Sequence, residues 1–240
     1  MTLERRFELI AEMSRLYGGS RRRRLAVWTK TLAWRSVVGG AEAVKRALDL
    51  VVAAELLVLL TPLFLAVAVA IKLTDGGPVL FWQTRVGRHG RSLRFPKFRS
   101  MRVDAEAVKA QLAAANQHGA SGVTFKMKRD PRITSIGRLI RKLSIDELPQ
   151  LWLVLAGDMS LVGPRPPVPS EVERYTVADR RRLDVKPGLT CTWQVSGRSD
   201  IPFDRQVELD VEYIQSRSVL VDIGLLARTV PAVLLGRGAY

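Results

Sequence analysis

Two adjacent acidic residues are the strongest candidates for chemistry in this chain. Asp146 and Glu147 lie in the segment LSIDELPQ, residues 143–150. Three basic residues precede them: Arg138, Arg141 and Lys142. If a helix begins at Asp146, Pro149 falls in its first turn, where proline is tolerated, and Asp146 lies at the positive end of the helix. We expect this carboxylate to be ionised, and an ionised carboxylate can attack phosphorus or hold a metal ion.

A structural role accounts for the same residues. Ser144 and Glu147 match the S-x-x-E capping box of a helix start. With Ser144 as the N-cap, Pro149 would fall at the fifth helical position, where proline costs about 3 kcal/mol. The residues alone therefore leave catalysis and capping equally open.

Three further basic residues lie where the backbone is restrained. Lys97 is in FPKFRSM, Arg165 lies between two prolines, and Arg198 is in SGRSD. Taken singly, each is more often a surface charge, but on a constrained backbone Arg and Lys make good phosphate ligands because little freedom is lost on binding. The sequence has no Walker or dinucleotide-binding glycine pattern, so a phosphate would be held mainly by side chains and metal.

The composition narrows the chemistry and the partners. The chain has 240 residues, 47% of them hydrophobic and 25% charged, with a formal net charge of +15. Such an excess predicts anionic partners such as lipid headgroups, nucleic acid or phosphorylated substrates. The single Cys191 excludes an internal disulfide, and two histidines do not suffice for a credible zinc site or a Ser-His-Asp arrangement. Any chemistry must therefore use carboxylates, Arg and Lys, with or without a hard metal ion.

An apolar run from Leu50 to Ile71 is expected to hold this chemistry at a membrane surface. Only Glu55, Thr61 and Pro62 interrupt the run. At about 1.5 Å per residue, a straight helix of this length would just cross a hydrocarbon core of roughly 30 Å. Proline near the middle should break the helix, and both flanks carry the Lys/Arg excess typical of the cytoplasmic side. We favour a re-entrant hairpin over a single span or a buried core helix, with Glu55 near the headgroups, paired or protonated.

The rest of the chain predicts short elements and rigid loops. We expect strands at 79–84 and 92–98 joined as a hairpin, because Gly- and Arg-rich residues separate them. Helices are predicted at 103–115, 133–143, 171–184 and 203–216, and 219–235 should pack in the core or lie in the membrane interface. The segments GPRPPVP and KPGLTCTWQVSGRSD read as loops.

These elements predict an α+β fold that is mostly helical. It combines a re-entrant membrane helix, broken by proline, with a compact cytoplasmic catalytic domain of surface helices and a few short strands. The expected parts are a basic N-terminal arm at 1–44, the membrane helix at 45–73, and a catalytic domain at 74–240 that ends in interfacial helices.

The ordered motifs resemble the bacterial sugar transferases, the monotopic polyprenyl-phosphate phosphoglycosyl transferases. The resemblance covers roughly Lys45 to Tyr240. Five features carry it: Lys45-Arg46 with Asp49 before a broken apolar run, PKFRSM, LSIDELPQLW, GDMSLVGPRP and KPGLTCTWQVSGR. It implies Mg²⁺ as cofactor and transfer of a sugar 1-phosphate from a UDP-sugar to polyprenyl (undecaprenyl) phosphate, with release of UMP, as the first membrane step of polysaccharide or glycoconjugate synthesis.

The resemblance also implies roles for individual residues. Asp146 would be the nucleophile, forming a phosphosugar-aspartyl intermediate, and a metal ligand. Glu147 would assist as a base or metal partner. Four basic residues would neutralise phosphate charge: Lys97, Arg141, Arg165 and Arg198. The sequence departs from many relatives at Cys191-Thr192-Trp193, where they have glycine, tryptophan and alanine, which leaves open how this loop meets the nucleotide or sugar.

A different class of function competes with this one. The charge and the RRRR run at 21–24 would also suit a non-enzymatic, membrane-anchored basic protein that binds nucleic acid or anionic lipid. Aromatic residues, at 7%, are sparse for a nucleic-acid surface. We therefore expect a UDP-sugar, polyprenyl phosphate and membrane lipids as partners and no nucleic acid, at the cytoplasmic face of a bacterial inner membrane. A homo-oligomer stays open.

Overall fold

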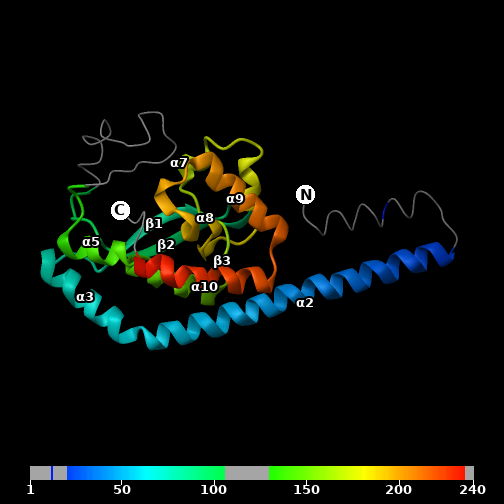
Figure 1. Ribbon diagram of the computed structural model, residues 1–240, viewed down its shortest axis with the longest axis horizontal. Helices are drawn as coiled ribbons and strands as arrows, with labels where there is room; N and C mark the ends of the chain where they lie inside the picture. Colours follow the sequence, from blue (N-terminus) through cyan, green and yellow to red (C-terminus); the bar gives the residue numbers. More distant parts are fainter. Residues whose placement is uncertain (1–11, 13–20, 106–129, 236–240) are drawn as a thin grey trace. The chain divides into compact units, whose positions relative to one another are not determined.

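The computed structural model describes residue 12 and residues 21–105 and 130–235 (Figure 1). Residues 106–115 of the predicted helix at 103–115, and residues 1–11 and 13–20 of the N-terminal arm, lie outside these ranges. The chain divides into two compact units, residues 1–48 and residues 49–240. Every element that positions the candidate site lies in the second unit.

The apolar run forms two helices with a break between them. Helix α2 spans Arg21–Leu59 and α3 spans Thr61–Asp75. Pro62, which has no N–H to donate, lies in the first turn of α3, and the Thr61 hydroxyl donates to the Leu57 carbonyl at 2.8 Å. No single helix among the described residues is long and apolar enough to cross a bilayer, whereas Gly39–Leu59 and Thr61–Asp75 meet that criterion together and are bent by 57°.

The predicted hairpin is confirmed. Strands β1 (Leu80–Val86) and β2 (Ser92–Phe98) pair antiparallel, with Leu80 opposite Phe98 and Val86 opposite Ser92. The turn between them contains the 3-10 segment η1 (Arg88–Gly90). The base of the hairpin rests on α3, because Phe98 packs in one buried cluster with Val67, Ile71 and Ile140.

Two further strands form a second sheet. Strands β3 (Ser160–Val162) and β4 (Gly188–Thr190) are parallel. Two glycines allow the strand ends to touch, since a Cβ on Gly188 would lie 2.0 Å from the Gly163 nitrogen. Gly188 N–H also donates to the Pro164 carbonyl at 2.9 Å, which fixes the start of the proline-rich loop.

Asp49 ties helix α2 to this second sheet. The Asp49 side chain is buried in the last third of α2, where its Oδ1 accepts hydrogen bonds from Ser160 Oγ at 3.1 Å and Leu161 N at 3.0 Å. Because β3 leads directly into the proline-rich loop, the helix and the loop are joined through one carboxylate.

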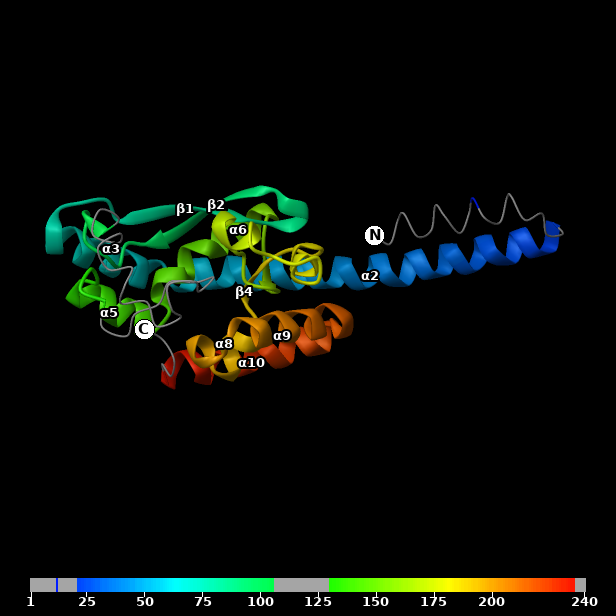
Figure 2. The same cartoon turned by 90° about the horizontal axis from the view of Figure 1, so that it is seen from above.

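The remaining helices belong to the second unit. They are α5 (Ser135–Lys142), η3 (Ile145–Gln150), α6 (Leu151–Ala156), α7 (Pro169–Val172), η4 (Asp179–Leu183), α8 (Thr192–Ser196), η5 (Arg198–Asp200), α9 (Phe203–Ser216) and α10 (Val219–Leu235). Figure 2 shows the hairpin on one side of β4 and the pair α9 and α10 on the other. The described residues are mostly helical with a few short strands, so the predicted α+β class is confirmed.

Two of the predicted elements need correction. The helix expected at 171–184 is wrong: only α7 and η4 form, because Thr176 N–H donates to Asp179 Oδ2 at 2.8 Å and Asp179 N–H donates to Thr176 Oγ1 at 3.3 Å. These mutual side-chain bonds compete with helical pairing. The segment KPGLTCTWQVSGRSD is also more ordered than a loop, since it contains β4, α8 and η5.

Candidate active site

Asp146 and Glu147 lie in the first turn of η3, on a backbone that turns sharply just before them. Ser144 has a φ of 54°, in the left-handed region that non-glycine residues rarely adopt, and makes no side-chain capping bond. The capping-box interpretation of Ser144 is therefore wrong. Pro149 is accommodated inside the 3-10 segment, and the α-helix begins only at Leu151.

Glu147 is fully engaged by two cations. Arg165 NH1 donates to its Oε2 at 3.0 Å and Arg165 NH2 to its Oε1 at 2.6 Å, while Lys97 Nζ donates to Oε1 at 2.7 Å. Burial alone would raise the pKa of Glu147, but the charges and hydrogen bonds of Arg165 and Lys97 outweigh it and hold the pKa well below its usual value. Glu147 is thus a permanent anion that orients two cations.

Asp146 lies next to this anion in a different state. It is 8% exposed, lies 4.0 Å from Lys97 Nζ, and makes no side-chain hydrogen bond to any described residue. Burial raises the pKa of Asp146 to about 6, against the opposing charge of Lys97 and with the help of the Glu147 charge. The carboxylate remains mostly ionised at neutral pH, as expected, but burial and not a helix end dominates its environment.

The hairpin presents Lys97 and a residue that sequence reasoning missed. Arg85 lies on the same face of the hairpin as Lys97, because Arg85 pairs with Leu93 and Phe81 with Lys97 in one antiparallel register. Both cations lie over the Phe95 ring, at 5.5 Å for the Arg85 guanidinium and 5.7 Å for Lys97 Nζ. The alternation of side chains along a strand could have identified Arg85 from the sequence, but only with the register between β1 and β2 known.

Arg85 also supports the proline-rich loop. Its NH1 donates to the Pro166 carbonyl at 3.0 Å and its Nε to Gln83 Oε1 at 2.9 Å. Burial and the nearby charge of Arg165 lower the pKa of Arg85 to about 10. The negative charges near Arg85 do not offset its burial, so an anion that binds beside it would stabilise its charged form.

The remaining predicted cations surround the same pair of carboxylates. Arg141, in the last turn of α5, lowers the pKa of Asp146 by its charge. Arg198 begins η5 with a φ of 52°; burial lowers its pKa, and the charges of Glu147 and Asp146 oppose that shift. The structure thus brings all six predicted chemical residues to one site, while the predicted break residues Thr61 and Pro62 lie at the junction of α2 and α3.

The net charge of the site suits a polyanion. Five basic side chains, including Arg85, face two carboxylates, which leaves a formal excess of three positive charges. Phosphates are the common biological groups that match such a set.

The donors fit a magnesium ion only in part. The described residues contain no cluster of three or more His, Cys, Asp or Glu side chains that could enclose a metal. Asp146 accepts no side-chain hydrogen bond from the part of the chain that the structure describes, which suits Mg²⁺, because that ion is commonly held by one or two carboxylates, water and substrate phosphates. Glu147 already accepts three charged hydrogen bonds and is poorly placed to serve as a metal ligand.

Comparison with known proteins identifies relatives of this chain. The model of the bacterial sugar transferase family matches residues 40–236. The galactosyl transferase CpsE of Streptococcus agalactiae is 57% identical over 166 residues, which cover 69% of this chain and 36% of the relative. The exopolysaccharide production protein ExoY of Sinorhizobium fredii is 40% identical over 205 residues, 85% of this chain and 90% of the relative.

A third relative is named for its lipid acceptor. The undecaprenyl-phosphate galactose phosphotransferase of Salmonella typhimurium is 44% identical over 198 residues, 82% of this chain and 41% of the relative. The chain therefore spans less than half the length of CpsE and of the Salmonella relative, and nine-tenths of ExoY.

Proposed function

This chain belongs to the bacterial sugar transferase family, and we propose that it transfers a sugar 1-phosphate from a UDP-sugar to undecaprenyl phosphate in polysaccharide synthesis. The names of the relatives support the galactose and undecaprenyl-phosphate chemistry and the link to exopolysaccharide. The observation that carries the proposal is the pair of adjacent carboxylates in opposite states: Glu147 is engaged by two cations, and Asp146 accepts no side-chain hydrogen bond from residues 21–105 and 130–235.

In the first half-reaction, Asp146 acts as the nucleophile. A carboxylate oxygen forms a bond to the phosphorus that carries the sugar, the bond from that phosphorus to the bridging oxygen breaks, and UMP leaves with the electron pair. A buried carboxylate with a pKa of about 6 is ionised at neutral pH and poorly solvated, which favours attack. Lys97 and Arg165 neutralise charge on the phosphate oxygens, where phosphoryl transfer needs it most.

In the second half-reaction, the lipid phosphate takes the group. An oxygen of the polyprenyl phosphate attacks the same phosphorus, the bond to the Asp146 oxygen breaks, and the carboxylate is restored. The product is a polyprenyl diphosphate sugar. Two sequential in-line displacements leave Asp146 unchanged, so one carboxylate serves both steps.

Glu147 is proposed to be a positioning residue. Its pKa lies well below the usual value because Arg165 and Lys97 bind it, so it is a weak proton acceptor. Its three charged hydrogen bonds instead fix the two cations that face the phosphates. This assignment replaces the base or metal-partner role that the family resemblance implied.

Mg²⁺ is proposed as the cofactor, held by Asp146 and by phosphate oxygens of the donor. When bound, a hard divalent ion neutralises diphosphate charge.

We propose that α2 and α3 form a re-entrant hairpin at the cytoplasmic face of the inner membrane. Several apolar side chains of the two helices are exposed and would contact lipid: Val58, Leu59, Leu65, Val69 and Leu73. Single cysteines replacing Lys30 and His89, on a Cys191→Ser background, test the topology. Both should be shielded from a membrane-impermeant thiol reagent in intact cells and react after permeabilisation; reaction of only one in intact cells would mean a true span.

The function is tested with the purified protein, Mg²⁺ and a panel of UDP-sugars. We expect UMP release with one or a few donors, and mass spectrometry of the protein with donor alone should find a phosphosugar on the Asp146 peptide. An active Asp146→Asn variant would refute the assignment. Absence of UMP with every donor, together with tight and salt-sensitive DNA binding, would favour the non-enzymatic basic protein.

A further inference from the structure

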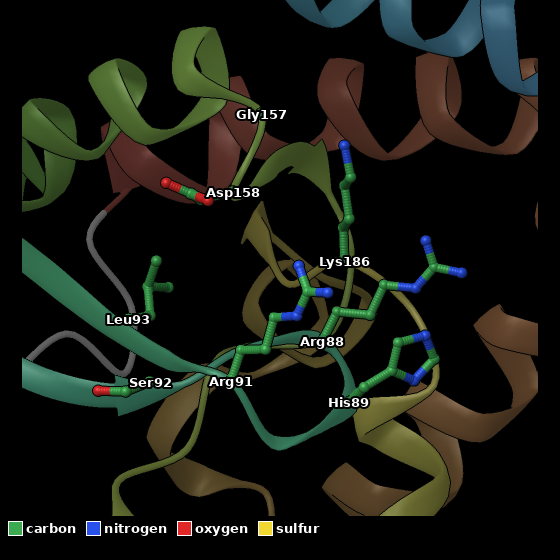
Figure 3. Close-up of a pocket in the computed structure, with 9 residues that line it drawn as sticks. Arg88, His89, Arg91, Ser92, Leu93, Gly157, Asp158 and Lys186 are labelled. Atoms are coloured by element: carbon green, nitrogen blue, oxygen red, sulfur yellow. The ribbon is translucent and has the colours of Figure 1, made fainter.

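A second basic cluster lies at the end of the hairpin remote from the candidate active site. It surrounds a cavity of about 240 Å³ lined by the hairpin turn at 87–93, by Gly157 and Asp158 after α6, and by Lys186 (Figure 3). We call this cavity the hairpin pocket. Ser92 and Lys97 are five residues apart on β2, so at about 3.3 Å per residue the pocket is roughly 17 Å from Lys97.

Backbone hydrogen bonds fix the walls of the hairpin pocket. Gly87 N–H donates to the Arg91 carbonyl at 2.7 Å, and Val86 N–H donates to the Pro167 carbonyl at 2.8 Å, which anchors the turn on the proline-rich loop. The residue after Lys186 is also held, since the Pro187 carbonyl accepts from Ser160 N–H at 2.9 Å. The pocket is therefore formed before any ligand arrives.

The charges of the hairpin pocket are unbalanced. Arg88, Arg91 and Lys186 line it together with one carboxylate, Asp158. Figure 3 shows the two arginines rising from the hairpin turn, with Lys186 and Asp158 on other segments of the wall. Among the residues that the structure describes, neither Arg88 nor Arg91 has an ion-pair partner, and Arg88 donates only its Nε, to the Asp184 carbonyl at 3.3 Å. Their guanidinium groups keep donors available for a ligand.

We propose that the hairpin pocket binds a phosphate group, carried either by a lipid headgroup or by a soluble ligand. Guanidinium groups bind phosphate oxygens through paired hydrogen bonds, and Lys186 adds a third positive charge to the wall of the cavity. The volume lies below the 300–1,000 Å³ or so of pockets that enclose drug-sized molecules, so a compact phosphate fits better than a nucleotide. This proposal does not depend on the proposed transferase function.

Arginine modification tests the proposal at the level of single residues. The full chain is placed in nanodiscs of zwitterionic lipid and treated with phenylglyoxal, and peptide mass spectrometry follows the modification of each arginine. The probes are inorganic phosphate, pyrophosphate and, in a parallel nanodisc, phosphatidic acid, each compared with chloride at equal ionic strength. Arg94 is the internal control, because it lies on the same hairpin but over the Trp82 ring, outside the pocket. Arg165 reports the candidate active site in the same digest.

We expect at least one phosphate probe to slow the modification of Arg91 about tenfold while Arg94 is unchanged. Protection by phosphatidic acid alone identifies a lipid headgroup, and protection by the soluble ions identifies a soluble ligand. Lys186→Ala should weaken the protection, and Asp158→Asn should strengthen it by removing the opposing charge. Equal rates for Arg91 with chloride and with every phosphate probe, in a protein that is folded, would overturn the proposal.

Discussion

Arg165 binds Glu147 through both terminal guanidinium nitrogens, at 3.0 and 2.6 Å, while the neighbouring Asp146 receives no hydrogen bond from any described residue. Two carboxylates that are adjacent in sequence are thus held in opposite electrostatic conditions. The same contrast predicts that removing their charges will change stability in opposite directions.

Asp146→Asn should abolish turnover and stabilise the fold. The folded-state pKa of about 6 lies above the usual 3.8, so the folded protein binds the proton more tightly than the unfolded chain, and stability falls as pH rises from about 4 to 6. At neutral pH the ionised side chain therefore costs roughly 1–3 kcal/mol. Asparagine should raise Tm at neutral pH, with a gain that fades in acid. Asp204→Asn, on the exposed start of α9, is the control, and an unchanged Tm for Asp146→Asn would contradict the burial argument.

Glu147→Gln should destabilise the fold. Its folded-state pKa is depressed, so its ionised form stabilises the protein at neutral pH, and that contribution is lost only in acid. Removing one partner of a buried ion pair leaves Arg165 and Lys97 uncompensated, at a cost of about 3–5 kcal/mol. Thermal unfolding measures this loss against Glu173→Gln, an exposed glutamate. A rise in Tm would show that the two cations do not need Glu147.

The pH dependence of turnover should report Asp146. The rate should fall about tenfold per pH unit below a midpoint of about 6 and level off above it, because only the ionised carboxylate attacks. Lys97 lowers the pKa of Asp146, so Lys97→Met should move the midpoint upward in addition to lowering the rate. Lys142→Met, exposed at the end of α5, should leave the midpoint in place. A profile that is flat across pH 6 would show that the pKa of Asp146 is not raised in the working enzyme.

Arg85→Lys should impair the donor site without unfolding the protein. Lysine keeps the positive charge but lacks the guanidinium group, which donates to the Pro166 carbonyl and to Gln83 Oε1 at the same time. Because Arg85 holds the loop that carries Arg165, we expect kcat/KM for the UDP-sugar to fall about tenfold to a hundredfold, with the pH midpoint unchanged. Arg94→Lys, on the other face of the hairpin, is the matched control. Equal kinetics for the two variants would remove Arg85 from the site.

Gly188→Ala should break the junction of β3 and β4. The added Cβ would lie 2.0 Å from the backbone nitrogen of Gly163, where no side chain can give way, so we expect a loss of several kcal/mol or no folded protein. Gly224→Ala is the control, since its Cβ would meet nothing within 4 Å and alanine favours a helix by up to about 1 kcal/mol. Thermal unfolding of both variants checks the contrast. Similar melting temperatures would mean that the backbones at Gly163 and Gly188 do not touch.

The sequence predicted the elements whose signals are local. Strand alternation and a Gly-rich turn located the hairpin, and amphipathic spacing located α9 at residues 203–216. The helix expected at 171–184 failed because Thr176 and Asp179 bond each other's backbone, which spacing does not reveal. The motif resemblance named six residues that the structure places near one another, and their roles stay predictions.

What the sequence could not provide depends on tertiary contacts. The raised pKa of Asp146 comes from burial, and the depressed pKa of Glu147 comes from residues 18 and 50 positions away. Arg85 was one charge among many until the register placed it on the face of Lys97. The capping role of Ser144 failed because its backbone is left-handed, which a serine does not signal.

Asp49 connects helix α2 to the candidate active site. Its two hydrogen bonds to the start of β3 connect α2 to the strand that leads to Arg165. If α2 lies in a bilayer as proposed, a change in bilayer thickness that tilts the helix would displace the loop that carries Arg165. The proposed transfer would then depend on lipid composition without any ligand entering the candidate site.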